Sequence, residues 1–214
     1  MIDGSASTAD LAGTIPATKI SANTEAGFSV VSYTGNNGSS ATIAHGLGSV
    51  PAMIIVKDRD DTSGWVVYHK GNTSAPETDY LVLNSTAATV DDINLWNDTA
   101  PTSSVFSVGG SGAVNDGTDY IAYVFAEIEG YSKMGAYTGN GNTEGQYIYT
   151  GFRPAYVLIK QSSSSGNNWS VHDNKRDVDN VVNTRLLAST SGAETTFTTL
   201  DFLSNGFKLR TTGG

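Results

Sequence analysis

Residues 44–57 read AHGLGSVPAMIIVK, a glycine-rich turn followed by one proline and a short, wholly apolar run. Pro51 has no backbone N–H, so it suits the first residue of a strand better than its middle. The run Ala52–Val56 does not alternate between apolar and polar residues, which is typical of a strand covered on both faces. This stretch therefore predicts a loop that leads into a buried strand.

The same pattern occurs a second time at residues 150–160, which read TGFRPAYVLIK. Tyr-Thr-Gly-Asn words begin at Tyr33 and Tyr137, and tryptophans stand at Trp65 and Trp169, in both cases 104 positions apart. The prolines that open the two apolar runs are 103 positions apart. Several landmarks in one order predict an internal duplication of a whole small domain rather than the short turns of a solenoid.

The predicted fold class is all-β, with two tandem β-sandwich-like units that arise from the duplication. Short β-type runs separated by Gly, Asn and Asp clusters are the signature of such a fold. We expect an extended arm or linker at residues 1–26, unit 1 at residues 27–131 and unit 2 at residues 132–214. The expected strands are 28–33, 41–44, 52–57, 65–68, 80–83, 105–108 and 120–127 in unit 1, and 133–137, 146–149, 155–160, 169–171, 185–188, 197–203 and 206–210 in unit 2.

Unit 2 is incomplete in the sequence, because it has no counterpart of the apolar segment Tyr120–Glu127. We expect that segment to be a central strand of unit 1. A sandwich that lacks its last strand has an open groove or a bare sheet edge, and bare edges recruit strands. Either the sequence is a piece of a longer chain, or another segment fills the gap. The candidates for that segment are Met1–Ala26 and a neighbouring subunit.

Composition excludes several classes of protein. The chain has 214 residues and a formal net charge of −9, and its Lys and Arg residues are scattered singly. This argues against a nucleic-acid partner, because phosphate binding needs a basic stripe. Cysteine is absent from the sequence, so disulfides and thiolate metal sites are excluded. The apolar runs are far shorter than the ~20 residues of a membrane-spanning helix, and we expect no membrane insertion.

The sequence predicts a protein that is not an enzyme. It has no motif of a serine hydrolase, a nucleotide-binding loop or a zinc protease. Its histidines lack the spacing to a nucleophile and an acid that a catalytic triad needs. We expect His45 to cap a turn, and His69 and His172 to lie at the exposed ends of the tryptophan-containing strands. Polysaccharide hydrolysis by a pair of carboxylates, such as Glu127 and Glu129, is the alternative.

Two acidic clusters are candidate metal sites, and a solvated loop with local salt bridges is the competing interpretation of each. Asp58 and Asp60 precede a turn, but Ser63 stands where an EF-hand loop needs glycine. The second cluster comprises Asp173, Asp177 and Asp179. No cofactor is predicted, and weakly bound Ca²⁺ is the ion that these carboxylates suggest.

Asparagine-rich loops and one tryptophan are the candidate contact residues. Trp65 and Trp169 occupy equivalent repeat positions within apolar strands, which favours core packing. Trp96 has no repeat partner and is expected in a loop, so we predict that it is exposed. The predicted contacts, on loops that a rigid scaffold presents, are Asn36, Asn37, Trp96, Asn97, Asn140, Asn142, Asn167 and Asn168.

The duplicated Tyr-Thr-Gly-Asn word, the two proline-led runs and the segment LDFLSNGFK at residues 200–208 resemble a family of uncharacterised domains in virion proteins of marine phages and cyanophages. These domains often lie next to concanavalin A/LamG-like lectin modules. The resemblance covers residues 27–210, and members usually close their second unit with an aromatic-rich strand, from which this sequence departs. The resemblance implies a tail-fibre-type virion setting, oligomeric assembly and contact with a host surface.

We therefore expect a non-enzymatic structural or adhesive module of a phage virion, part of a tail fibre or related appendage. It would assemble with copies of itself, as a trimer or polymer, and with other virion proteins. We expect it to be made in the host cytoplasm and to act in the virion or otherwise outside the cell. Two alternatives are a lectin-like module that binds a cell-surface glycan, and a subunit of an extracellular filament assembled by strand exchange.

Overall fold

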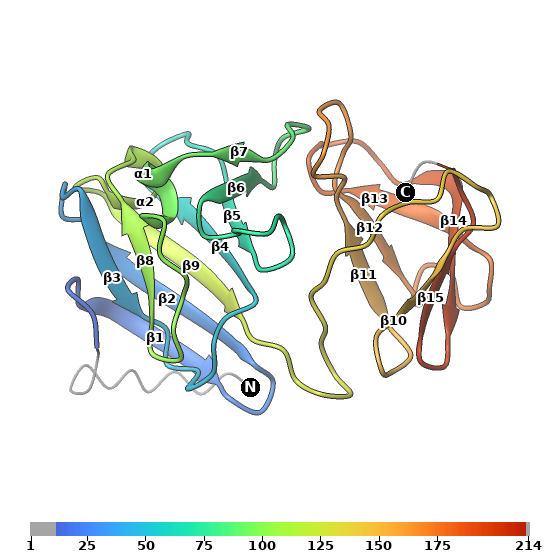
Figure 1. Ribbon diagram of the computed structural model, residues 1–214, viewed down its shortest axis with the longest axis horizontal. Coiled ribbons are helices and arrows are strands. Elements are labelled where there is room, and N and C mark those ends of the chain that lie inside the picture. Colours follow the sequence, from blue (N-terminus) through green and yellow to red (C-terminus); the bar gives the residue numbers. More distant parts are fainter. Residues whose placement is uncertain (1–11, 213–214) are drawn as a thin grey trace. The chain divides into compact units, whose positions relative to one another are not determined.

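The computed structural model describes residues 12–212 and shows an all-β chain (Figure 1). Its described residues form two compact units. Unit 1 comprises the described residues up to Val82 together with Thr89–Ile128, and unit 2 comprises Leu83–Ala88 together with the described residues from Glu129 onwards. The predicted all-β class is therefore confirmed.

Unit 1 is built on a seven-stranded antiparallel sheet in the order β1-β2-β9-β4-β5-β6-β7, and a smaller sheet pairs β3 with β8. Side chains of β3, β8 and two short helices join those of the large sheet in one core, which gives the two layers of a sandwich. The elements are β1 (Ala17–Asn23), β2 (Phe28–Thr34), β3 (Ser40–Ala44), β4 (Met53–Asp58), β5 (Val66–His69), β6 (Asp79–Val82), β7 (Val90–Asp91), α1 (Ile93–Trp96), β8 (Val105–Gly109), α2 (Gly112–Asn115) and β9 (Asp119–Phe125).

The unbroken apolar run forms β4, an inner strand of the large sheet. Met53 pairs with Phe125 of β9 on one side and with His69 of β5 on the other. Ile54 and Val56 are buried in the core, and the remaining apolar residues of β4 are buried as well. The prediction of a strand covered on both faces is therefore confirmed for this copy.

Strand β9 is an inner strand of the large sheet of unit 1. Along its length it pairs with both β2 and β4. Tyr120, Ala122 and Val124 alternate along β9 and each is 0% exposed on the core face. The ring of Tyr120 stacks on that of Tyr33 at a centroid distance of 5.0 Å. The expected central strand is confirmed.

The segment before Gly27 is extended, as expected of an arm, but it belongs to the sheet of unit 1. Strand β1 pairs antiparallel with β2, so it forms one edge of the large sheet. Ile15 and Ala17 are buried in the unit 1 core. Residues 1–11 of the predicted arm lie outside the described residues.

Unit 2 is a single six-stranded antiparallel sheet in the order β10-β15-β14-β13-β12-β11. The long strand β14 pairs with both β13 and β15 and so joins the two halves of the sheet. A smaller core lies on it, formed by Val157, Val182, Leu200, Phe202, Phe207 and Leu209. The elements are β10 (Tyr147–Tyr149), β11 (Tyr156–Ile159), β12 (Ser170–Asp173), β13 (Val182–Leu187), β14 (Thr195–Leu203) and β15 (Gly206–Leu209).

The strand registers of the two units correspond. In unit 1, Ile54 of β4 pairs with Tyr68 of β5. In unit 2, Val157 of β11 pairs with His172 of β12, and these residues lie 103 and 104 positions further along the chain. The neighbouring ladders, β5 with β6 and β12 with β13, correspond in the same way. These matching registers support the predicted duplication.

A buried aromatic contact is also shared by the two units, in different surroundings. Tyr33 meets Phe106 edge-on at a centroid distance of 6.3 Å, and Tyr137 meets Phe207 edge-on at 6.5 Å. In unit 1 the Tyr33 hydroxyl donates a hydrogen bond to the carbonyl oxygen of Val114 (2.7 Å). Among the described residues, the buried hydroxyl of Tyr137 has no such acceptor. In the part of the chain that the structure describes, unit 2 thus repeats the aromatic pair without the hydrogen bond of unit 1.

Two expectations for unit 2 are wrong. Residues 133–137 do not form a strand. Strand β11 is not covered on both faces but lies at the edge of its sheet, where Tyr156 is 57% exposed. In unit 1 the corresponding segments, β2 and β4, are both held by hydrogen bonds to β9. Among residues 12–212 neither segment of unit 2 has such a ladder, and β11 lies at the edge of its sheet.

We expect Tyr33→Phe to lower the free energy of unfolding of unit 1 by about 1–2 kcal/mol, because the buried carbonyl of Val114 loses its donor. The matched change Tyr137→Phe removes a hydroxyl without an acceptor among residues 12–212, so unit 2 should be unchanged or slightly more stable. Denaturant unfolding followed by amide hydrogen exchange in each unit measures both effects. Equal losses in the two variants would contradict the difference between the two sites.

Candidate binding cavity in unit 2

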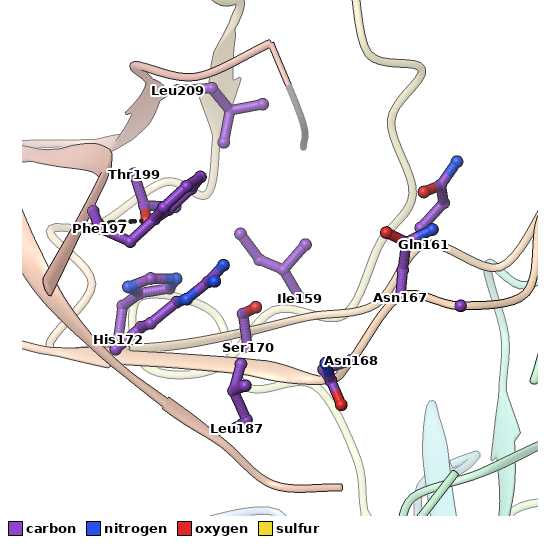
Figure 2. A pocket seen from close by; sticks show the side chains of 12 residues that line it. Ile159, Gln161, Asn167, Asn168, Ser170, His172, Leu187, Phe197, Thr199 and Leu209 are labelled. Carbon is purple, nitrogen blue, oxygen red and sulfur yellow. Dashed lines mark hydrogen bonds between the residues drawn. The ribbon is translucent and has the colours of Figure 1, made fainter. Parts of the chain in front are cut away.

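Unit 2 carries a cavity of about 170 Å³ on one face of its sheet (Figure 2). In Figure 2, Gln161 and Asn167 lie at one end of the cavity and His172 and Phe197 at the other. The apolar part of the lining comprises Ile159, Leu187, Phe197 and Leu209. The polar part comprises Gln161, Gly166, Asn167, Asn168, Ser170, His172, Arg185 and Thr199.

Strand alternation places the lining side chains on one face. Residues two apart in a strand point to the same side of the sheet. Ser170 and His172 of β12 are such a pair, as are Arg185 and Leu187 of β13, and Phe197 and Thr199 of β14. These three neighbouring strands therefore supply a contiguous floor of alternately polar and apolar groups.

His172 is the most deeply buried polar residue of the cavity, with 0% exposure. Neither ring nitrogen makes a hydrogen bond of ordinary geometry to any described residue, although the backbone of Thr184 lies close enough to favour the charged form slightly. Burial lowers the pKa of His172 to about 4, and the positive charges of Arg185 and Arg176 act in the same direction. The imidazole is therefore neutral at pH 7 and can offer one donor and one acceptor to a bound molecule.

Arg185 and Phe197 form a second feature of the same floor. The guanidinium carbon of Arg185 lies 4.1 Å above the centre of the Phe197 ring, which is the geometry of a cation–π contact. Its Nε donates a long hydrogen bond of 3.4 Å to the hydroxyl of Thr195. The remaining N–H groups of the guanidinium fork are the strongest donors in the lining.

Two amides complete the opposite end. The side-chain nitrogen of Asn167 donates to the hydroxyl of Ser164 (3.4 Å), and Asn168 accepts a hydrogen bond from Ser189 (2.7 Å). Amides, hydroxyls, one guanidinium and an aromatic ring are groups that recognise a polar, uncharged or anionic small molecule. No carboxylate belongs to the described lining, so the two acidic groups of a glycoside hydrolase are not found at this cavity.

Of the predicted contact residues, Asn167 and Asn168 line the cavity, and the other asparagines lie in turns elsewhere. Asn36 and Asn37 are exposed and accept hydrogen bonds from Gly38 (2.9 Å) and Gly117 (3.1 Å). Asn97 ends α1 in the left-handed conformation. Asn140 and Asn142 are exposed and accept backbone hydrogen bonds within their own turn. Their side chains hold loops in shape and are not gathered into one surface with the cavity.

The prediction that Trp96 is an exposed contact is wrong. Trp96 ends the short helix α1 and is 2% exposed in the unit 1 core. Its ring meets that of Tyr68 edge-on at a centroid distance of 5.9 Å. In unit 1, α1 lies between β7 and β8, whereas in unit 2 the long strand β14 fills the segment that leads to β15, so the two units differ in structure at this point.

Most carboxylates of the acidic clusters accept hydrogen bonds from protein donors. Asp58 is buried and accepts hydrogen bonds from the backbone N–H of Asp60 (2.9 Å) and from the hydroxyl of Thr118 (3.0 Å). Asp173 pairs with Arg176 (2.6 Å), and Asp177 accepts from the backbone N–H of Thr184 (2.7 Å). Among residues 12–212 no group of three His, Asp or Glu side chains has a metal-binding arrangement, and this includes Asp179.

The histidines have three different environments. His45 caps its turn as expected, since its Nδ1 accepts from the N–H of Leu47 (3.3 Å) and its Nε2 lies 3.1 Å from the carbonyl oxygen of Thr102. Burial lowers the pKa values of His45 and His69. The expectation that His172 lies at an exposed strand end is wrong. The repeat offset of 104 residues aligns His172 with Tyr68, which is buried in unit 1. This alignment is the sequence signal that indicates a buried position for His172.

The fold and the cavity define an all-β protein of two units, one closed around its core and one with a polar cavity on its sheet. The chain belongs to the family described as a domain of unknown function (DUF7483), whose sequence profile matches residues 2–214. Neither the curated proteins nor the solved structures gave a significant match. The two helices among the described residues have four residues each, so neither is long enough to cross a membrane.

Proposed function

We propose that the protein is a non-enzymatic structural and adhesive module of a phage virion, in which unit 1 is the scaffold and unit 2 the binding unit. The observation that carries this proposal is the unit 2 cavity, with its neutral buried imidazole, its arginine–phenylalanine pair and its amides. The virion setting rests on the resemblance of the two proline-led runs and the Tyr-Thr-Gly-Asn words. Assembly with copies of itself and with other virion proteins belongs to the same proposal.

The closed packing of unit 1 supports its role as a scaffold. Its core is continuous from β3 and β8 to β9 and α1, and it includes the largest fully buried side chains of the chain, Trp96, Tyr33 and Tyr120. A scaffold of this kind holds its own exposed loops in place. Unit 2 has the smaller core and leaves part of its sheet face open.

A lectin-like activity of the same cavity is the second candidate function. Hydroxyl groups of a sugar are recognised by side chains that donate and accept hydrogen bonds beside an apolar ring face. Asn167, Ser170 and Arg185 supply such groups, and Phe197 supplies the ring. The proposed ligand class is a cell-surface glycan, and no metal ion is needed for this mode of binding.

We expect the wild-type protein to bind a subset of glycans on an array, equally well with and without a chelator. Arg185→Ala should lower the affinity for those glycans at least about tenfold, because a charged donor is lost from the cavity floor. Arg153→Ala removes an exposed arginine that does not line the cavity and serves as the charge-matched control. Binding that Arg185→Ala leaves intact would place the glycan site elsewhere, and binding to no glycan would remove the lectin-like candidate.

A further inference from the structure

Arg185 is the single charged side chain among the described residues that line the unit 2 cavity. Two other arginines of unit 2 are neutralised by carboxylates. Arg176 lies 2.6 Å from Asp173, and Arg210 lies 2.6 Å from Asp201. Among residues 12–212, Arg185 has no such carboxylate partner. The floor of the cavity therefore carries one positive charge that the described part of the chain does not balance.

The contact with Phe197 holds the guanidinium group of Arg185 and leaves most of its N–H groups available. The guanidinium carbon lies 4.1 Å from the centre of the ring, and Nε donates only a long hydrogen bond of 3.4 Å to Thr195. Neither Nη1 nor Nη2 makes a hydrogen bond to a described residue. A guanidinium group that stacks on an aromatic face keeps its in-plane N–H donors for a planar carboxylate, which accepts two of them side by side.

His172 lies opposite Arg185 on the same face of the sheet. The register of β12 and β13 pairs Val171 with Leu186, so the next position pairs His172 with Arg185. Besides burial, the nearby positive charge of Arg185 lowers the pKa of His172, which agrees with this placement. Both ring nitrogens of His172 are buried without a partner among the described residues. Because the ring is neutral at pH 7, it adds no second charge beside the guanidinium group.

The opposite end of the cavity offers uncharged donors and acceptors. In Figure 2, Asn167 lies at the end away from His172. The side-chain nitrogen of Asn167 donates to Ser164 (3.4 Å), which leaves its carbonyl oxygen as an acceptor. The side-chain oxygen of Asn168 accepts from Ser189 (2.7 Å), which leaves its N–H groups as donors. Neighbouring donors and acceptors of this kind match the hydroxyl groups of a sugar.

We propose that the cavity binds one acidic sugar unit, with its carboxylate on the guanidinium group of Arg185 and its hydroxyl groups on the amides at the opposite end. The inference rests on the lectin-like candidate of the proposed function and names its sugar class. One guanidinium group balances one negative charge, and the net charge of −9 disfavours a phosphate dianion. The cavity of about 170 Å³ is smaller than the about 300–1,000 Å³ of sites for drug-sized ligands, so it takes one sugar unit.

Titration of the full wild-type chain with the methyl glycoside of glucuronic acid and with its carboxamide tests the charge of the ligand. The two probes have the same shape, but only the first has a carboxylate. We expect the acid to bind at least about tenfold more tightly than the amide, and added salt should reduce this difference. Chemical-shift changes of the backbone amides of β12, β13 and β14 measure the affinity and locate the site.

Equal affinities of the acid and the amide would overturn the inference and leave the lectin-like candidate standing for neutral glycans. Binding of neither probe, or shifts confined to other strands, would overturn it as well, and the glycan array then decides the lectin-like candidate separately. The methyl glycoside of N-acetylneuraminic acid distinguishes a sialic acid from a uronic acid, and a preference for either supports the inference. Cyclohexanecarboxylate has no hydroxyl group and should bind at least about tenfold more weakly than the glucuronic acid probe. Equal binding of these two would overturn the sugar class.

Three variants assign the two ends of the cavity. Arg185→Gln should bind the acid and the amide equally, to within about twofold, because the charge that distinguishes them is gone. Asn167→Ala should weaken both probes by the same factor, about three- to tenfold, and keep their ratio. Arg153→Gln changes an exposed arginine outside the lining and should leave both affinities within about twofold. A preference for the acid that persists in Arg185→Gln would overturn the inference, and the wild-type titrations test it whether or not this variant folds.

Discussion

Trp96→Ala is expected to lower the free energy of unfolding of unit 1 by about 4 kcal/mol, the loss typical of a large aromatic residue truncated in a core. Trp96 is 2% exposed and packs edge-on against Tyr68. Its removal leaves a cavity between α1 and the large sheet. The surrounding strands are held by hydrogen bonds to one another, so they can fill this cavity only in part. Urea unfolding, followed by amide signals of β4 and β9, measures the change.

Two further variants make this result specific. Ile93→Ala alters the same helix at a side chain that is 54% exposed and is expected to change stability by less than about 0.5 kcal/mol. Trp96→Phe keeps an aromatic ring and removes an indole N–H that has no partner among the described residues, so its loss should be clearly smaller than that of alanine. If the Trp96→Ala protein were as stable as the wild type, the Trp96 side chain would be exposed and not buried in the core.

Acidification from pH 6.5 to pH 4 is expected to remove up to about 3 kcal/mol from the stability of unit 2 through His172. Its pKa is about 4 in the folded protein, below the ordinary value of 6.5, because burial disfavours the charged imidazole. Between these pH values the unfolded chain binds a proton that the folded chain does not bind. The contribution of neutral His172 to stability is therefore present above pH 6.5 and is lost as the pH falls from 6.5 to 4.

His172→Phe provides the control for this pH dependence. The equivalent position in unit 1 holds Tyr68, so an aromatic ring is compatible with the strand pairing there. We expect the variant to lose the dependence between pH 6.5 and pH 4 and to be more stable than the wild type near pH 4.5. His172 is the only histidine of unit 2, so urea titrations read from amide signals of β13 and β14 isolate it. Parallel pH curves of variant and wild type would show that the imidazole is not buried as described.

The candidate site was only partly accessible from the sequence. Asn167 and Asn168 were recognisable because they stand in a polar loop before a strand. Arg185 and Phe197 gave no such signal, since their contact joins two strands whose pairing depends on the turn between them. The asparagines in the other loops had the same local appearance as Asn167 but accept hydrogen bonds from their own turns. Local composition does not distinguish an asparagine that shapes a turn from one that faces a cavity.

The sequence by itself determined the all-β class, the buried strand β4 and the central strand β9, because apolar runs and glycine-rich turns are local properties of the chain. Only the tertiary structure decided that the equivalent run β11 is an edge strand, that Trp96 is buried and that His172 faces a cavity. The physical reason is that coverage depends on segments distant in sequence. Strand β9 lies more than 60 residues after β4 in the chain and closes unit 1, and no described residue does the same for unit 2.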